Sequence, residues 1–196
     1  MLRDGALGLR FAGWRVDGEP PRAKKYVALA YPHTSNWDGL LLLALTRSVG
    51  MDISWLIKDD WMKGPLGVAL RSQGAIGVNR KGAHNLVDRM VAEMKSRDEL
   101  ALFIPPEGTR GRAERWKSGF YHIALGANVP VIPAYLDYGR KRGGFGPAVH
   151  LTGNVREDMD KIRAYYKEVN PAGCYPAKVG PIVLREEADA SGATAV

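Results

Sequence analysis

The stretch "YVALAYPHTSNWDGLLLLALTRSV", residues 26–49, joins two segments of different character. Residues 26–30 form a short apolar run, which has the length of a buried strand. Residues 37–49 hold a longer apolar run between Asp38 and Arg47, which predicts a helix with one buried face. A strand followed at once by a helix is the repeating unit of parallel sheets. This stretch therefore predicts a βα unit.

The same alternation continues along the chain. We expect further strands at 53–57, 75–78, 100–104 and 129–135, and helices at 61–71, 86–94, 120–126 and 158–169. Residues 139–146, "GRKRGGFG", predict a basic, glycine-rich loop. The expected fold is α/β, a single domain with a predominantly parallel mixed sheet flanked by helices. The domain is expected to span residues 1–185, and residues 186–196, small and polar, a disordered tail.

Composition narrows the class of protein. The 196 residues are 45% hydrophobic, enough for one sizeable core, and the net charge of +7 indicates an anionic partner. No apolar stretch reaches the length of a transmembrane helix, and residues 1–15 lack the uninterrupted core of a signal peptide. We expect a cytoplasmic protein. The alternative is peripheral attachment to the cytoplasmic face of an anionic membrane, through the weakly amphipathic start and the basic loop.

Charged and polar residues follow four consecutive predicted strands. His33 follows the first, Lys58 the second, Arg80 the third, and Glu107 with Arg110 the fourth. Ligands of parallel α/β sheets bind at the carboxyl ends of the strands. These residues are therefore expected to line one cleft.

His33 and Asp38 allow two interpretations. Ser35 is the expected N-cap of the helix, and Asp38, three residues later, can reach back as in a capping box and complement the helix dipole. A carboxylate at that position can also accept a hydrogen bond from one imidazole nitrogen, which leaves the other nitrogen to take a proton from a hydroxyl. The residues alone leave both interpretations open.

A second stretch, "FIPPEGTRG" at 103–111, ends a predicted strand with two prolines. Glu107 and Arg110 then stand on one rigid turn, and an arginine there suits a phosphorylated ligand because it binds phosphate through two hydrogen bonds. The alternative is a surface turn with a local ion pair.

Together these stretches resemble the glycerolipid acyltransferase family, to which the lysophosphatidate (1-acyl-glycerol-3-phosphate) acyltransferases belong. Its first motif, a histidine, four residues and an aspartate, is matched by His33 and Asp38, with Pro32 in place of the usual asparagine. The other motifs are matched, in the family's order, by residues 74–80, 106–110 and 129–133.

The resemblance implies the roles of these residues. His33 would be the general base that deprotonates an acceptor hydroxyl, and Asp38 would hold the ring in the required tautomer. The phosphate of the acceptor would meet Lys58, Arg80 and Arg110, although Lys63 competes with Lys58 for that role. The remaining residues of the third motif, Glu107, Gly108 and Thr109, would shape the acceptor pocket, where a backbone N–H is a candidate oxyanion donor.

The resemblance also implies the substrates. The donor would be acyl-CoA or an acylated acyl carrier protein, the acceptor a phosphorylated lipid such as lysophosphatidate, and neither a cofactor nor a metal ion is expected. One alternative is a thioesterase, in which the same pair of residues activates water. The other is a basic nucleic-acid-binding module, which we disfavour because the basic patch lacks interleaved aromatic residues for stacking on bases.

Overall fold

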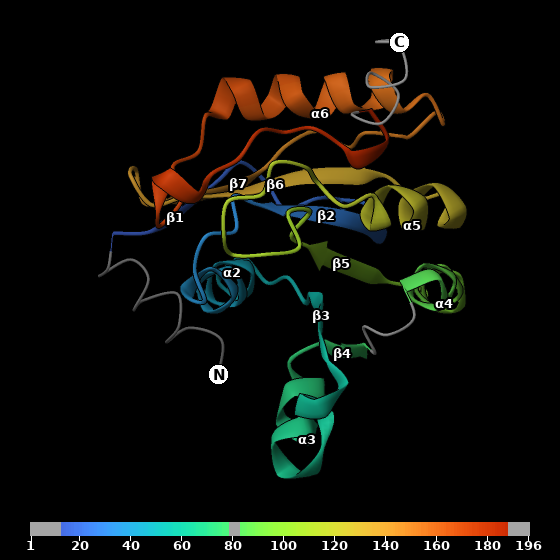
Figure 1. Cartoon of the computed structure of the whole chain (residues 1–196). Coiled ribbons are helices and arrows are strands. Elements are labelled where there is room, and N and C mark those ends of the chain that lie inside the picture. Colours follow the sequence, from blue (N-terminus) through green and yellow to red (C-terminus); the bar gives the residue numbers. More distant parts are fainter. Residues whose placement is uncertain (1–12, 79–82, 188–196) are drawn as a thin grey trace.

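The computed structural model describes residues 13–78 and 83–187. Figure 1 shows a twisted sheet with helices on both sides. The strands are β1 (Arg15–Asp17), β2 (Lys25–Tyr31), β3 (Ser54–Lys58), β4 (Ala75–Val78), β5 (Leu100–Ile104), β6 (Val131–Asp137) and β7 (Arg142–Phe145). The helices are α2 (Trp37–Ser48), η1 (Asp59–Met62), α3 (Gly64–Ser72), α4 (Ala83–Ser96), α5 (Gly119–Ala127), α6 (Val155–Val169) and η2 (Pro176–Lys178).

Within the described ranges, seven strands form one sheet in the order β1-β7-β6-β2-β5-β3-β4. Every pair of neighbours is parallel except β6 with β7. The predicted α/β class and the predominantly parallel mixed sheet flanked by helices are therefore confirmed.

The sequence interpretation predicted neither β1 nor β7. Residues 142–145, assigned to a basic glycine-rich loop, form β7, which pairs with β6 on one side and with β1 on the other. The loop assignment was wrong because the two glycines of β7 sit where side chains do not fit. A Cβ at Gly144 would come within 2.7 Å of the Tyr135 ring. Glycine in a strand often marks such a close approach.

Each face of the sheet has its own core. Along β2, Val27 and Leu29 face one core, which also holds Met90 of α4, Phe120 of α5 and Ile162 of α6. The alternate residues of β2, Tyr26 and Ala28, face a second core, against which Leu42 and Leu43 of α2 pack. α4, α5 and α6 therefore cover one face and α2 the other, and Figure 1 shows α6 above the sheet and α3 below it. The two-residue period of a strand accounts for this division.

The parallel strands bring distant residues to one edge. Since β2, β3, β5 and β6 all run in the same direction, the residues that follow them lie at the same edge of the sheet. These include His33 after β2, Glu107 after β5 and Tyr138 after β6. This edge is where ligands of α/β proteins bind.

Some expected features lie outside the described residues: Arg80, residues 1–12 of the amphipathic start, and residues 188–196 of the expected tail. Of that tail, Glu186 and Glu187 are described. Glu187 accepts hydrogen bonds from the Arg163 guanidinium at 2.9 Å, so this part of the tail contacts α6. No helix within residues 13–78 and 83–187 has the length and apolar character needed to span a bilayer.

Candidate active site

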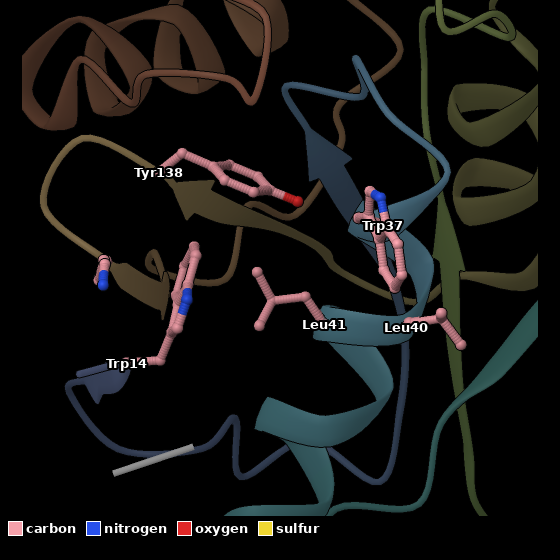
Figure 2. Close-up of a pocket in the computed structure, with 6 residues that line it drawn as sticks. Trp14, Trp37, Leu40, Leu41 and Tyr138 are labelled. Atoms are coloured by element: carbon pink, nitrogen blue, oxygen red, sulfur yellow. The ribbon is translucent and has the colours of Figure 1, made fainter. Parts of the chain in front are cut away.

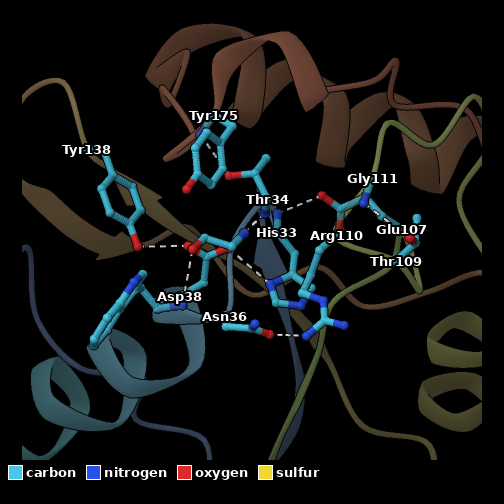
Figure 3. A network of polar contacts seen from close by, with 12 residues as sticks. His33, Thr34, Asn36, Asp38, Glu107, Thr109, Arg110, Gly111, Tyr138 and Tyr175 are labelled. Carbon is cyan, nitrogen blue, oxygen red and sulfur yellow. Dashed lines mark hydrogen bonds and ion pairs between the residues drawn. The ribbon is translucent and has the colours of Figure 1, made fainter.

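His33 and Asp38 meet at the carboxyl end of β2 (Figure 3). The His33 Nδ1 atom lies 3.1 Å from the Asp38 Oδ2 atom. A proton on Nδ1 then faces the carboxylate, and Nε2, on the far side of the ring, carries a lone pair. The geometry is that of a histidine oriented by a carboxylate, which can act as a base toward a hydroxyl.

The Asp38 carboxylate is buried, with 5% of the residue exposed, and it accepts several hydrogen bonds. Its Oδ2 atom also accepts from the backbone N–H groups of Thr34 at 2.7 Å and Ser35 at 2.8 Å. Burial on its own raises the pKa of Asp38, but the hydrogen bonds from His33, Ser35, Tyr138 and Thr34 together hold that pKa below its ordinary value. Asp38 is therefore an anion at neutral pH.

Asp38 makes both kinds of contact that the two interpretations require. The carboxylate binds the N–H groups of the turn that begins α2, which is the capping role, and it also contacts the His33 ring. The expected N-cap residue was wrong by one position, because Asn36 occupies it. Ser35 still contributes, since its hydroxyl accepts from the Trp37 N–H at 3.2 Å. The cap fixes the carboxylate, and the fixed carboxylate orients the ring.

Tyr138 is a third member of this network that the sequence interpretation missed. Its hydroxyl donates to the Asp38 Oδ1 atom at 2.8 Å. The ring packs edge-on against Trp14, with centroids 5.2 Å apart, so its position is fixed from both ends. The rule that served for His33 would have found Tyr138, because it directly follows the parallel strand β6.

Tyr138→Phe should lower the rate of the reaction by about tenfold, since a hydrogen bond to a charged group contributes ~1.5–3 kcal/mol. The loss of one donor should also raise the pKa of Asp38 and move the acidic limb of the pH–rate profile upward. The profile and the thermal unfolding of the variant check this. An unchanged rate and profile in a folded variant would show that the contact plays no part in orienting the site.

Glu107 connects the third motif to the first. Its Oε1 atom accepts from the backbone N–H of His33 at 2.8 Å, and only 6% of the residue is exposed. The other oxygen, Oε2, is buried and has no hydrogen-bond partner among the described residues. Burial raises the pKa of Glu107 to about 7. The surface ion pair considered for Glu107 and Arg110 is therefore not what this carboxyl forms.

Glu107→Gln should change how stability depends on pH. The folded pKa of about 7 lies above the ordinary value of 4.5, so ionisation of Glu107 destabilises the folded protein as pH rises through 7. Between pH 5 and pH 8 the unfolding free energy of the variant should gain about 2–3 kcal/mol relative to the unsubstituted protein. Urea unfolding at both pH values measures this difference. A constant difference would contradict a raised Glu107 pKa.

The turn after Glu107 has a defined shape. Gly108 adopts a φ of +64°, a left-handed backbone conformation that favours glycine, and the Lys117 side chain packs over it. Its N–H donates to the Pro105 carbonyl at 3.2 Å, which commits that group to the turn and makes it unsuitable as an oxyanion donor. Thr109 closes the turn through its hydroxyl, which accepts from the Gly111 N–H at 3.1 Å.

Of the predicted phosphate-binding residues that the structure describes, Arg110 lies beside this network, whereas Lys58 and Lys63 do not contact it. The Arg110 guanidinium donates to the side-chain oxygen of Asn36, beside the start of α2 and within the same cluster as His33. Lys58, the last residue of β3, is exposed and instead pairs with Asp60, its Nζ atom 2.6 Å from Oδ2. Lys63 is exposed at the start of α3. The structure brings together His33, Asp38, Glu107, Gly108, Thr109 and Arg110.

An apolar pocket of about 380 Å³ adjoins this network (Figure 2). It is lined by Trp14, Trp37, Leu40, Leu41, Tyr138 and Lys141. Tyr138 belongs to both, since its ring lines the pocket and its hydroxyl contacts Asp38. The site therefore combines a buried polar network with an apolar surface next to it.

Comparison with solved structures defines the class of fold. The protein is similar to the 1-acyl-sn-glycerophosphate acyltransferase PlsC from Thermotoga maritima, with a TM-score of 0.60 over 86% of this chain and 78% of that one. At 16% sequence identity this likeness shows the fold alone.

The sequence comparisons define the family. The family model described as Acyltransferase matches residues 14–137, well over half of the chain, and the protein therefore belongs to the acyltransferase family. A 1-acyl-sn-glycerol-3-phosphate acyltransferase from Haemophilus influenzae is 29% identical over 132 residues, 62% of this chain and 53% of that protein. The enzyme of that name from Escherichia coli is 38% identical over 58 residues, 28% of this chain and 23% of that one. The chain thus spans about half the length of the first relative. The resemblance drawn from the four motifs is confirmed.

Proposed function

We propose that this protein is an O-acyltransferase of the 1-acylglycerol-3-phosphate type. It moves a fatty acyl group from acyl-CoA or an acyl carrier protein to the hydroxyl of a phosphorylated lipid such as lysophosphatidate. The observation that carries the proposal is the 3.1 Å contact between His33 Nδ1 and Asp38 Oδ2, with Asp38 held ionised by further hydrogen bonds. Membership of the family supports the reaction class.

In the proposed mechanism the acceptor hydroxyl gives its proton to His33 Nε2 as its oxygen attacks the thioester carbonyl. The resulting imidazolium is stabilised by the Asp38 carboxylate. When the tetrahedral intermediate collapses, the carbon–sulfur bond breaks and the imidazolium returns the proton to the departing thiolate. The products are an ester and a free thiol. The thioester is already activated and the base is a side chain, so the proposal requires no cofactor or metal ion.

The turn beside His33 suits the acceptor. Arg110 reaches Asn36 next to the histidine, and a guanidinium there can bind a phosphate through two hydrogen bonds. The buried Oε2 atom of Glu107 can accept from a second hydroxyl of the glycerol unit, which would give that atom a partner. We assign Arg80 and either Lys58 or Lys63 to the phosphate on the strength of the motifs.

We also propose a cytoplasmic location with peripheral attachment to an anionic membrane, and no nucleic-acid partner. Part of the basic loop at 139–146 is neutralised within the protein, which weakens the electrostatic attraction of this loop for nucleic acid and for an anionic membrane alike. Arg140 pairs with Asp137, and Arg142 pairs with Asp17 at 3.1 Å.

An acceptor screen tests the proposed function. The protein is incubated with isotopically labelled acyl-CoA or acyl carrier protein and a panel of lysolipids that differ in headgroup, and mass spectrometry identifies the acylated product. We expect diacylated product from lysophosphatidate and much less from lysolipids without a terminal phosphate. Equal acylation of lysolipids with and without that phosphate would contradict the assignment of the acceptor.

A further inference from the structure

The helix α3 and the turn before it carry apolar side chains that nothing in the described structure covers. Trp61 of η1 and Leu66 and Val68 of α3 are each more than half exposed. Large apolar residues in such a group mark a surface that meets another apolar phase. Figure 1 shows α3 projecting from the lower side of the sheet, away from α5 and α6.

The exposed part of α3 presents one broad apolar face. Gly67 faces inward, where a Cβ would lie 2.0 Å from the Met62 carbonyl oxygen, and this contact seats η1 against the helix. Pro65, Leu66, Val68 and Ala69 are all exposed, and at 100° per residue they lie within an arc of about 160° on the side opposite Gly67. A helix with such a face can lie in the interfacial plane of a bilayer, with its apolar side turned into the lipid.

The same edge and face of the sheet carry a second exposed apolar group. Trp37 and Leu40 of α2 are more than half exposed and line the apolar pocket beside Asp38. α2 follows the carboxyl end of β2 and η1 follows that of β3, so Trp61 and Trp37 lie at the same edge. The connections from β2 through α2 to β3 and from β3 through α3 to β4 both lead toward the β4 end of the sheet. Because such connections between parallel strands are right-handed, α2 and α3 lie on the same face.

We propose that these five residues, the docking face Trp37, Leu40, Trp61, Leu66 and Val68, insert into the interfacial layer of an anionic bilayer. The choice of a bilayer as partner rests on the proposed function, because a lysophospholipid acceptor resides in a membrane. Tryptophan is enriched at this depth of a bilayer. Two cations flank the apolar turns of α3, Lys63 before them and Arg71 in the last turn, and suit anionic headgroups. Asp59 and Asp60 lie on η1, and Asp60 pairs with Lys58.

This orientation explains how an acyl chain reaches the site. With the docking face in the bilayer, the pocket wall formed by Trp37 and Leu40 opens toward the lipid phase, and the His33–Asp38 pair lies just beyond it. The acceptor then presents its hydroxyl without leaving the membrane. The acyl chain of the lipid would then meet the apolar surface, and its polar headgroup would meet the polar network.

Vesicle co-sedimentation tests the proposal, with no acyl donor or acceptor present. The double variant Leu66→Ser with Val68→Ser is compared with Leu125→Ser, which removes an exposed leucine (41%) from α5 in the opposite layer. On phosphatidylcholine vesicles containing phosphatidylglycerol, binding of the double variant should fall by about tenfold or more, and binding of Leu125→Ser should match the unsubstituted protein. Equal binding of all three proteins would overturn the proposal. So would sedimentation showing a dimer that the double variant dissociates.

Activity assays separate this proposal from the proposed function. The double variant should lose transfer to lysophosphatidate in vesicles but keep transfer to a short-chain, water-soluble lysophosphatidate. Loss of both in a folded variant would place α3 within the site itself and overturn the docking role. If the unsubstituted protein acylates neither acceptor, the proposed function fails, while the vesicle-binding result stands on its own.

Discussion

His33→Ala should remain folded and lose acyl transfer by about a thousandfold or more. A positioned general base contributes roughly 10²–10⁴ in rate, and His33 is the side chain that the Asp38 carboxylate orients for this role. Asp38 is held as an anion by hydrogen bonds. Glu107 is buried, and its carboxylate accepts a hydrogen bond from the backbone N–H of His33. Mass spectrometry of the acylated lipid measures the loss, and thermal unfolding verifies the fold.

His122→Ala is the matched control for that variant. His122 lies on α5, half exposed, with its Nε2 atom 3.5 Å from Glu186, a residue outside the His33–Asp38 network. This substitution should leave the rate unchanged. Full transferase activity in a folded His33→Ala protein would rule out His33 as the base.

Asp38→Asn should lose less, on the order of ten- to a hundredfold. The position of Oδ2 must hold an acceptor, because the N–H groups of Thr34 and Ser35 both point at it. The amide oxygen will therefore occupy that position and still accept from His33 Nδ1, so the tautomer of the ring is kept. What the variant lacks is the negative charge that stabilises the imidazolium, and this loss should appear in kcat.

Asp38→Asn also separates the two roles of the residue. If Asp38 only capped α2, the variant would show a slightly lower unfolding free energy and an unchanged rate. Measuring kcat and urea unfolding on the same preparation distinguishes these cases. A reduced kcat with nearly unchanged stability is the result that the network predicts.

Much of the fold could be predicted because the chain is locally regular. The apolar run at 26–30 is short and is followed at once by a helix, so it predicts a parallel strand that is buried on both faces. The helix at 158–169 was expected too late by one turn, since its start at Val155 depends on the Asn154 side chain accepting from the Glu157 N–H. The edge strand β1 and its neighbour β7 have little apolar content, and they form because β6 offers an open side to β7, which in turn pairs with β1.

The site was predictable where residues follow strands and unpredictable where contacts span the chain. His33, Asp38 and the turn at 107–110 could be found from motifs and strand ends. The hydrogen bond from Tyr138 to Asp38 joins residues 100 positions apart, and the one from His33 to Glu107 joins residues 74 apart. No local pattern specifies such pairs, because they arise only when parallel strands are placed side by side.

We propose that His33 and Asp38 direct the acyl group to a lipid hydroxyl and not to water. The most direct measurement follows free thiol and acylated lipid in the same reaction, with acyl-CoA, in the presence and absence of lysophosphatidate. We predict that thiol release depends on the lysophosphatidate and matches the acylated lipid mole for mole. Thiol released at the same rate without acceptor, as free fatty acid accumulates, would contradict the claim and identify a thioesterase.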